Sequence, residues 1–192
     1  MTSSRIPPCG RPAHRGSKLT AENILSEAGK LLQEQGKVPS IRTLAAQLQV
    51  DPMAIYYYFR NKQALLEALA TALVDDIYQP SAQAPVQQEL QRLAESYLHL
   101  LYIYSDLLDI LLSLNSDGPS GCFRQRYLRI IAPCGLSESR QTAILHLLAD
   151  ALHGHTVAIR RTDYTFEQSR ALFQPVLALI TELIERPGAS LS

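Results

Sequence analysis

Two short helices are predicted in close succession between residues 40 and 59. Ser40 is suited to cap the first, and Asp51 followed by Pro52 is typical of the start of the second, which runs to about Phe59. Only the three residues LQV, at 48–50, separate them. A pair of short helices across so tight a turn has the layout of a helix-turn-helix, although such pairs also occur as plain packing units.

A longer amphipathic helix precedes the pair and buttresses it. Thr20 can cap this helix, and Gly36 can close it. Its apolar residues recur at helical spacing, at Ile24, Leu25, Ala28, Leu31 and Leu32. Because the second helix of a DNA-binding helix-turn-helix lies in the major groove, the segment 51–59 is the candidate recognition helix.

The remainder of the chain also has the apolar spacing of helices, and no stretch alternates with period two. Asn61 can cap a helix that ends before Pro80, and Ser137 and Thr165 can cap two long helices. The expected elements are helices over 62–78, 86–114 with a break near Ser105, 122–131, 138–161 and 166–185, with a linker at 79–85 and a turn at 115–121. The sequence therefore predicts an all-α protein.

The net charge of zero conceals an asymmetry along the chain. Residues 1–62 contain nine Lys or Arg and four Asp or Glu, a net charge of +5, and the remaining residues contain nine and fourteen, a net charge of −5. A basic N-terminal module on an acidic body indicates that the module binds a polyanion. Chance clustering of solvated charge is the alternative, unless a motif supports the first interpretation.

Several classes of protein do not fit the sequence. The longest apolar stretch, 98–112, is interrupted by Ser105, Asp106 and Asp109, and falls short of the roughly 18 unbroken apolar residues of a membrane helix. The N-terminus has no apolar segment of the kind that directs secretion, so a cytoplasmic protein without membrane contact is expected. The three cysteines lack CxxC spacing, so ordinary thiols are expected, with redox sensing as an alternative.

The segment SIRTLAAQLQVDPMAIYYYFRNKQALLEALA, 40–70, resembles the DNA-binding domain of the TetR family of bacterial transcriptional regulators. The LA-x-x-L-x-V core, the I-Y-x-x-F run and the NK-x-x-L-L continuation occur together, and the resemblance covers about residues 19–70. It implies a homodimeric repressor that binds a palindromic operator and is released by a small-molecule effector. The implied fold is an N-terminal three-helix helix-turn-helix domain followed by a helical ligand-binding and dimerisation domain.

On this interpretation the chain has four parts. They are a flexible basic arm at 1–18, a helix-turn-helix domain at 19–62, a connecting helix and linker at 63–84, and an effector-binding and dimerisation domain at 85–192. The turn position that the family usually fills with glycine is Gln49 here. A non-glycine residue at this position is expected to adopt a left-handed backbone, at a cost of about 1 kcal/mol.

The three adjacent tyrosines of the recognition helix are expected to face different surroundings. At about 100° per residue, Ile55 and Phe59 share the face that packs on the first two helices. Tyr57 lies opposite them and is expected at the floor of the groove, and Tyr56 is expected at a phosphate or sugar. Tyr58 is expected at the edge of the core, with its hydroxyl at the rim.

The predicted DNA-binding surface extends beyond the tyrosines. Met53 and Ala54 can add apolar contacts to bases, and the resemblance implies phosphate contacts from Arg42, Thr43 and Lys62. With the residues at the start of the recognition helix, the predicted set outside the arm is Arg42, Thr43, Asp51, Pro52, Met53, Ala54, Tyr56, Tyr57 and Lys62.

The basic arm contains Gly10-Arg11-Pro12, the core of a hook that lays an arginine in a narrow A·T minor groove. Because a duplex bound to the neighbouring helices would lie within reach of the arm, Arg11 and Arg15 are candidate minor-groove contacts. An arm that makes no contact with DNA is the alternative.

The last long helix, 166–185, is apolar around much of its circumference, and such a helix needs two packing partners. We expect one of them to be a second subunit, with helices 138–161 and 166–185 of each chain forming a four-helix interface. The alternative is a single larger core within one subunit. Pro175, which is expected to kink the helix, is compatible with both.

Polar residues among the apolar positions of the C-terminal region are candidate effector contacts. These residues are Tyr97, His99, Tyr102, Tyr104, His146, Asp150 and His153. The last three share one helix face, where Asp150 could orient a histidine or help to hold a divalent ion. Packing and surface roles are more common for such histidines, so no metal site and no cofactor are predicted. The expected effector is a small molecule of unknown identity, for which an apolar compound is at least as plausible.

Two other functions are compatible with parts of the sequence. One is a constitutive DNA-binding protein without an effector. The other is a helical enzyme with an incidental basic module, but the sequence contains no nucleophile beside a base, no Gly-rich phosphate loop and no spaced set of metal ligands. Ligand-responsive regulation of transcription, rather than catalysis, is the expected function.

Overall fold

The structure is a computed structural model that describes residues 19–81, 84–104, 106–114 and 118–185. Its α-helices are α1 Ala21–Gln35, α2 Ile41–Gln47, α3 Pro52–Tyr58, α4 Lys62–Asp75, α5 Val86–Ile103, α6 Leu107–Ser113, α7 Gly118–Ile131, α8 Glu138–Ile159 and α9 Phe166–Glu185, and a 3-10 turn spans Ala132–Cys134. The all-α prediction is confirmed. The predicted arm at 1–18 lies outside the described residues. None of the described helices is long and apolar enough to cross a membrane.

The first three helices form a small compact unit around a shared core. Each begins at its predicted cap, whose side chain accepts a backbone N–H: Thr20 from Asn23 (3.2 Å), Ser40 from Thr43 (3.0 Å) and Asp51 from Met53 (2.8 Å). The helix α1 closes at Gly36, which has a φ of 62°. Ile24, Leu44 and Ile55, one from each helix, are fully buried. Local capping therefore sets the helix boundaries, and apolar burial holds the three helices together.

The turn between α2 and α3 depends on a left-handed residue. Gln49 has a φ of 55°, as its place in the motif predicts. The N–H of Gln49 donates to the carbonyl of Ala46 (3.1 Å), and the N–H of Val50 donates to that of Ala45 (3.0 Å). This is the hydrogen-bond pattern of a Schellman turn, usually built on glycine. Its two bonds satisfy carbonyls at the end of α2 and offset the cost of the left-handed backbone, about 1 kcal/mol.

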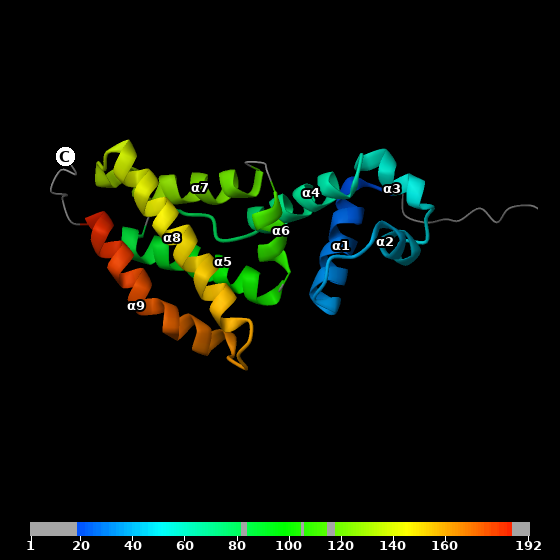
Figure 1. Ribbon diagram of the computed structural model, residues 1–192. Coiled ribbons are helices and arrows are strands. Elements are labelled where there is room, and N and C mark those ends of the chain that lie inside the picture. Colours follow the sequence, from blue (N-terminus) through cyan, green and yellow to red (C-terminus); the bar gives the residue numbers. More distant parts are fainter. Residues whose placement is uncertain (1–18, 82–83, 105, 115–117, 186–192) are drawn as a thin grey trace, which may run out of the picture.

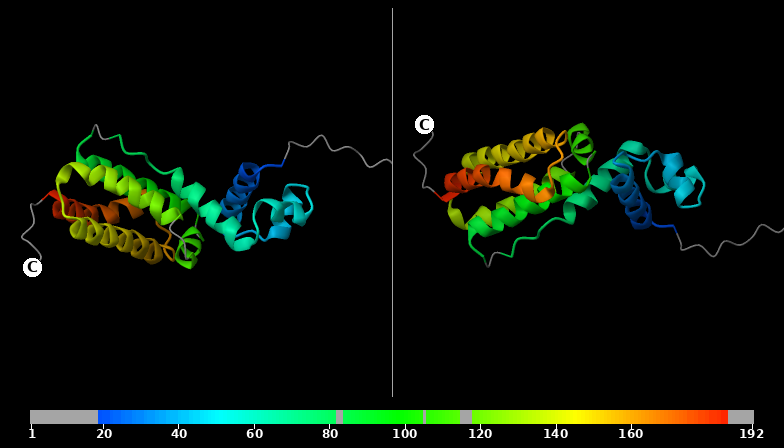
Figure 2. Two further views of the ribbon diagram at one scale, coloured as in Figure 1. Left: turned by 90° about the horizontal axis from the view of Figure 1, so that it is seen from above. Right: turned by 90° about the horizontal axis from the view of Figure 1, so that it is seen from below.

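The helix α4 connects this unit to the rest of the molecule (Figures 1 and 2). Its last carbonyls accept from Arg126 of α7, a side chain that is only 3% exposed. The guanidinium of Arg126 donates to the carbonyl of Val74, to that of Asp75 (2.6 Å) and to Asp75 Oδ1 (2.9 Å). The end of one helix is thus capped by a side chain that lies far away in the sequence.

Two predicted helix boundaries were wrong. The helix predicted over 62–78 ends at Asp75, because the N–H of Tyr78, which would continue it by bonding to the carbonyl of Val74, donates instead to Ser96 Oγ (3.1 Å), and Arg126 donates to that carbonyl. The helix predicted to start at residue 122 starts at Gly118, inside the predicted turn. Pro119 falls in its first turn, where the missing N–H of proline has no helical partner to lose. The break expected near Ser105 is present between α5 and α6, although Ser105 itself lies outside the described residues.

The helices α5, α7, α8 and α9 pack side by side in the larger part of the molecule (Figures 1 and 2). Leu93, Tyr127, Leu148 and Leu177, one from each helix, are buried in a core that is continuous with that of the N-terminal helices. The continuity of this core through α4 makes the two parts mechanically dependent on each other.

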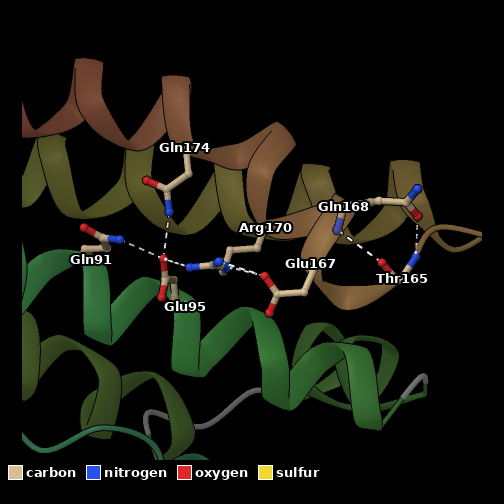
Figure 3. Close-up of polar contacts among 7 residues, drawn as sticks. All are labelled: Gln91, Glu95, Thr165, Glu167, Gln168, Arg170 and Gln174. Carbon is tan, nitrogen blue, oxygen red and sulfur yellow. Dashed lines mark hydrogen bonds and ion pairs between the residues drawn. The ribbon is translucent and has the colours of Figure 1, made fainter.

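Polar contacts fix the position of α9 on α5 (Figure 3). Glu95 Oε1 accepts from Gln174 Nε2 (2.7 Å) and from Arg170 Nη1 (3.3 Å). At the start of α9, Thr165 and Gln168 each accept the other's backbone N–H through their side chains, which is a capping box at the predicted cap. These bonds set the orientation of a helix whose apolar faces alone would allow sliding.

A buried carboxylate anchors the connection between α4 and α5. Glu89 is 2% exposed and accepts from the N–H (3.2 Å) and hydroxyl (2.8 Å) of Ser81 and from the hydroxyl of Tyr78 (3.1 Å). Burial by itself would raise the pKa of Glu89, but the bonds from Ser81 and Tyr78 and the nearby charge of Arg92 outweigh it and lower the pKa. The ionised carboxylate is therefore a structural group.

We expect Glu89→Gln to lower the free energy of unfolding by about 1–3 kcal/mol at pH 7, because charged hydrogen bonds to a buried group are lost. Since the pKa of Glu89 is lower in the folded than in the unfolded protein, its contribution is present above its ordinary value of 4.5 and is lost as the pH falls through the lower folded value. Urea denaturation of both proteins from pH 7 to pH 3 measures the difference.

The exposed Glu34→Gln is the matched control and should change stability by less than about 0.5 kcal/mol. A Glu89→Gln difference that stayed constant down to pH 3 would contradict the structural role of the ionised form.

Candidate nucleic-acid interface and effector cavity

The helix α3 presents an exposed aromatic and apolar face. Tyr57 is 86% exposed and Met53 is 69% exposed, whereas Ile55 is fully buried and Phe59 nearly so. The helical spacing therefore divides the helix as predicted, with the buried pair in the core and Tyr57 opposite. Large apolar groups that a folded protein leaves in water on a short helix mark a surface available for a partner.

The other two tyrosines lie at intermediate positions around α3. The hydroxyl of Tyr58 donates to the backbone carbonyl of Leu19 (2.5 Å), so this side chain ties α3 to the chain that enters α1. The ring of Tyr57 meets that of Tyr58 edge to face, with centroids 5.4 Å apart. Tyr56 is exposed on the flank. The three tyrosine rings thus lie in different surroundings, and the ring of Tyr58 packs against that of Tyr57.

The three predicted phosphate contacts lie at the first turns of helices. Arg42 and Thr43 lie at the start of α2, Lys62 is the first residue of α4, and all three are exposed. The hydroxyl of Thr43 is 2.8 Å from that of Ser40. Helix N-termini present unpaired N–H groups and the positive end of the helix dipole, which favours anions. At these positions the charged side chains of Arg42 and Lys62 and the hydroxyl of Thr43 lie near backbone N–H groups that can also bind an anion.

The remaining predicted DNA contacts have more mixed positions. Asp51 uses Oδ1 to cap α3, and Pro52 and Ala54 are half-buried beside it. Arg11 and Arg15 lie outside the described residues.

A cavity of about 600 Å³ lies between α7 and α8 and is closed by α5 and α6. The residues of α8 that line it fall on one stripe of that helix: Thr142, Leu145, His146, Ala149 and His153. The residues of α7 that line it come from the first half of that helix: Pro119, Ser120, Gly121, Phe123 and Arg124. Tyr97 of α5 and Leu111, Leu112 and Leu114 of the α6 region complete the lining. A cavity of this size accommodates a drug-sized molecule.

Of the predicted effector contacts, Tyr97, His146 and His153 line this cavity. The hydroxyl of Tyr97 is 2.9 Å from His153 Nε2, so the two side chains form a hydrogen-bonded pair across α5 and α8. Burial raises the pKa of the Tyr97 hydroxyl. Burial also lowers the pKa of His153, against the opposing charge of Asp150. Both groups are therefore neutral at pH 7.

The other predicted effector contacts do not line the cavity. The ring of His99 packs edge-on against Phe166, with centroids 4.7 Å apart, and the hydroxyl of Tyr102 donates to the carbonyl of Tyr164 (3.3 Å). Both contacts reach the start of α9 and its preceding loop, because His99 and Tyr102 lie on the side of α5 that faces α9.

Tyr104 and Asp150 lie elsewhere. Tyr104 lines a second, more open depression of about 430 Å³ between α1 and α4. Asp150 is exposed on α8, outside the stripe that faces the cavity. Within the part of the chain that the structure describes, no three His, Cys, Asp or Glu side chains gather in a geometry that could hold a metal ion.

Two arginines of α7 were missed in the sequence. Arg124 lines the cavity, and Arg126, two residues further along and nearly on the opposite face of α7, caps α4. A signal for Arg126 was available, because it falls between Phe123 and Ile130 on the apolar face of α7, where a charge has to be paired. Arg124 is exposed and gave no such signal.

The last two helices leave an apolar stripe uncovered. Leu172, Val176, Leu179 and Leu183 of α9 are exposed, and they recur at the i, i+4, i+7 and i+11 spacing of one helix face. Leu147 of α8 is exposed as well. The opposite face of α9 is buried in the core, so this helix has two apolar faces, as its composition predicts.

Comparison with known proteins places these features in a family. The profile described as "Bacterial regulatory proteins, tetR family" matches residues 24–69. The chain is 26% identical over 151 residues to the class E tetracycline repressor of Escherichia coli, covering 77% of this chain and 72% of that protein. It is 31% identical to the class A repressor from transposon 1721 of Escherichia coli, covering 63% of this chain and 58% of the relative.

Solved structures share the whole architecture. A TetR variant from Acinetobacter baumannii AYE, in complex with minocycline, has a TM-score of 0.74 at 24% identity, covering 90% of this chain and all of that one. BioQ with its double-stranded DNA operator has a TM-score of 0.69 at 23% identity, covering 88% of this chain and 99% of that one. At these identities the likeness shows the fold alone. The profile match shows that residues 24–69 form a DNA-binding domain of the TetR type, and the curated relatives support TetR-family membership and the role of a DNA-binding transcriptional regulator.

Proposed function

We propose that the protein is a ligand-responsive repressor that binds a palindromic operator as a homodimer and is released by a small-molecule effector. The observation that carries this proposal is the bond between the two parts of the chain: Arg126 joins α7, which lines the cavity, to the end of α4, which leads to the helix-turn-helix. The proposal is supported by the names of its relatives, which are tetracycline repressors, and by the operator and minocycline complexes of its structural neighbours.

In the proposed complex, α3 lies in the major groove. Tyr57 and Met53 reach the bases, where a thymine methyl or a base edge can meet an apolar or phenolic group. Tyr56 contacts the backbone beside them. Ala54 and Pro52 lie beside the face of α3 that enters the groove, and they limit how closely the groove wall can approach α3.

Phosphates flank the recognition helix in this arrangement. Arg42, Thr43 and Lys62 bind them from two different helix N-termini, which fixes the angle of α3 in the groove. Asp51 holds α3 in register through its cap and approaches DNA only as an acceptor for a base amino group. We include Arg11 and Arg15 as minor-groove contacts of the arm.

The uncovered stripe of α9 supports the homodimer. Four apolar side chains at helical spacing, in water, amount to an unfilled packing site, and α8 offers Leu147 beside them. A two-fold axis through this region would pair α8 and α9 with their copies in a four-helix interface, and would present two copies of α3 to two half-sites.

Release would follow from a shift of α7. A ligand that fills the cavity pushes on the first half of α7, and Arg126 couples any movement of that helix to the end of α4. The equilibrium moves only as far as the ligand prefers one arrangement over the other. A constitutive DNA-binding protein remains the competing function, and it predicts operator binding that no small molecule changes.

Selection of bound DNA from a random pool tests the proposal directly. We expect the full chain to enrich a palindrome whose half-sites are one helical turn, or a multiple of it, apart. Small-molecule fractions from bacterial extracts should then release the enriched duplex. An enriched site that no fraction releases would favour the constitutive protein, and failure to enrich any sequence would contradict operator binding altogether.

We expect Tyr57→Ala to weaken binding to the enriched duplex about tenfold or more without lowering the melting temperature, because the side chain touches solvent rather than core. Fluorescence anisotropy and thermal unfolding measure the two effects. The control is Ile55→Ala, two residues away and fully buried, which should cost about 2–5 kcal/mol of stability. If the Tyr57→Ala variant binds the duplex with unchanged affinity, Tyr57 does not contact the bases in the groove.

We expect Leu179→Glu to convert the homodimer into a folded monomer, because it places a charge in the centre of the uncovered stripe. Light scattering after size exclusion measures the mass, and circular dichroism checks the fold. The matched control is Ala178→Glu, an exposed neighbour about 100° away on the same helix, which should remain dimeric. A dimeric Leu179 variant would place the interface elsewhere.

A further inference from the structure

The wall of the cavity between α7 and α8 changes character from floor to rim. Its floor consists of buried side chains from three helices, Tyr97, Pro119, Phe123 and Leu145. The exposed residues of its lining, at the rim, are four with hydrogen-bonding atoms, Ser120, Arg124, Thr142 and His146, and one apolar residue, Leu112. A molecule that fills this space therefore meets an apolar interior and a polar entrance.

Two polar side chains of the cavity interior, Tyr97 and His153, are paired with each other. The hydroxyl of Tyr97 and the ring of His153 bond to each other at 2.9 Å. A ligand group that reaches them finds mainly aromatic and aliphatic surface and is not required to supply a donor or an acceptor. The interior thus favours an apolar body.

The charge of the lining is one-sided. Among the described residues of the lining, Arg124 is the one permanently charged residue, His146 and His153 are the other ionisable nitrogen groups, and none is Asp or Glu. This contrasts with the surrounding domain, because residues 63–192 carry a net charge of −5. The entrance of the cavity is therefore positively charged, although the domain around it is acidic.

The guanidinium of Arg124 is also available to a ligand. Other arginines of the domain pair with carboxylates: Arg126 with Asp75 at 2.9 Å, Arg160 with Asp109 at 3.0 Å and Arg170 with Glu167 at 2.7 Å. Among the described residues, no hydrogen bond or ion pair engages Arg124. A planar guanidinium with free N–H groups matches the two oxygens of a carboxylate.

We propose that the effector of this protein is an amphipathic organic monoanion, whose carboxylate binds Arg124 at the rim and whose apolar body fills the space between Phe123 and Leu145. The inference rests on the proposed ligand-responsive function. A single full positive charge favours a monoanion over a phosphate dianion, and it disfavours a cation. Thr142 and His146, on the same stripe of α8, lie at the rim beside the carboxylate site.

The test compares ligands of one shape and different charge on the full-length dimer. Isothermal titration calorimetry is carried out with 2-naphthoate, 2-naphthalenemethanol and 2-naphthylmethylamine, and with decanoate and decanol to separate aromatic from aliphatic bodies. We expect a carboxylate to bind about tenfold tighter than the alcohol of the same shape, as for one charge-assisted hydrogen-bonded pair, and the amine to bind most weakly.

Substitution of the arginine connects this preference to the structure. Arg124→Gln should reduce the ratio of carboxylate to alcohol affinity to near one while leaving alcohol binding unchanged, and Arg124→Lys should restore part of it. Arg129→Gln is the matched control, because Arg129 is an exposed arginine of the same helix that does not line the cavity. It should leave the ratio unchanged.

The outcomes separate this inference from the function on which it rests. Equal affinity for carboxylate and alcohol, or a preference that survives Arg124→Gln, would overturn the anionic effector. If either of these results is found but extract fractions still release the operator, ligand control is retained and only the proposal of an anionic effector is wrong. If no probe binds the wild-type protein and no fraction releases the operator, both are wrong.

Discussion

The insertion of the Arg126 guanidinium into the end of α4 is the interaction on which the rest of the molecule depends. A helix that ends inside a protein leaves carbonyl oxygens without partners, and burying them unpaired is costly. Arg126 satisfies those of Val74 and Asp75 from α7. Because this side chain is 3% exposed, it cannot easily exchange protein partners for water. The helix that carries the DNA-binding unit is thereby fixed to the helix that lines the cavity.

This arrangement gives one helix two kinds of contact. The first half of α7 faces the cavity through Phe123 and Arg124, and the next turn faces α4 through Arg126. In the proposed function, a ligand would not have to deform the core in order to act at a distance, since a small displacement of α7 would reach α4 through the bonds of Arg126. The same logic explains why Glu89, in the first turn of α5, accepts three hydrogen bonds from residues of the connection after α4. A loose connection would let α4 move without α7.

The surfaces proposed to bind DNA and a second subunit are built in the opposite way. Tyr57, Met53 and Leu179 are large apolar side chains that folding leaves in water, so they contribute little to the stability of the single chain. Each lies on a helix whose other face is buried: Ile55 beneath the first two, and Leu177 and Ile180 beneath the third. On each of these helices the buried face therefore stabilises the fold, and the exposed face remains available for binding. For this reason we expect a substitution at Tyr57 to affect binding without unfolding the protein.

The sequence by itself determined the all-helical class and the first turns of the helices that begin at a side-chain cap, because a cap such as Thr20, Ser40 or Asp51 bonds to an N–H two or three residues away. It also determined the faces of α3, which follow from helical spacing, and the left-handed Gln49, which the family resemblance implied for that turn position. Only the tertiary structure decided where α4 ends, which of the seven polar candidates share a cavity, and that Arg124 stands at its rim. Those results depend on contacts such as Arg126 with Val74, 52 residues apart, and no local pattern encodes such a distance.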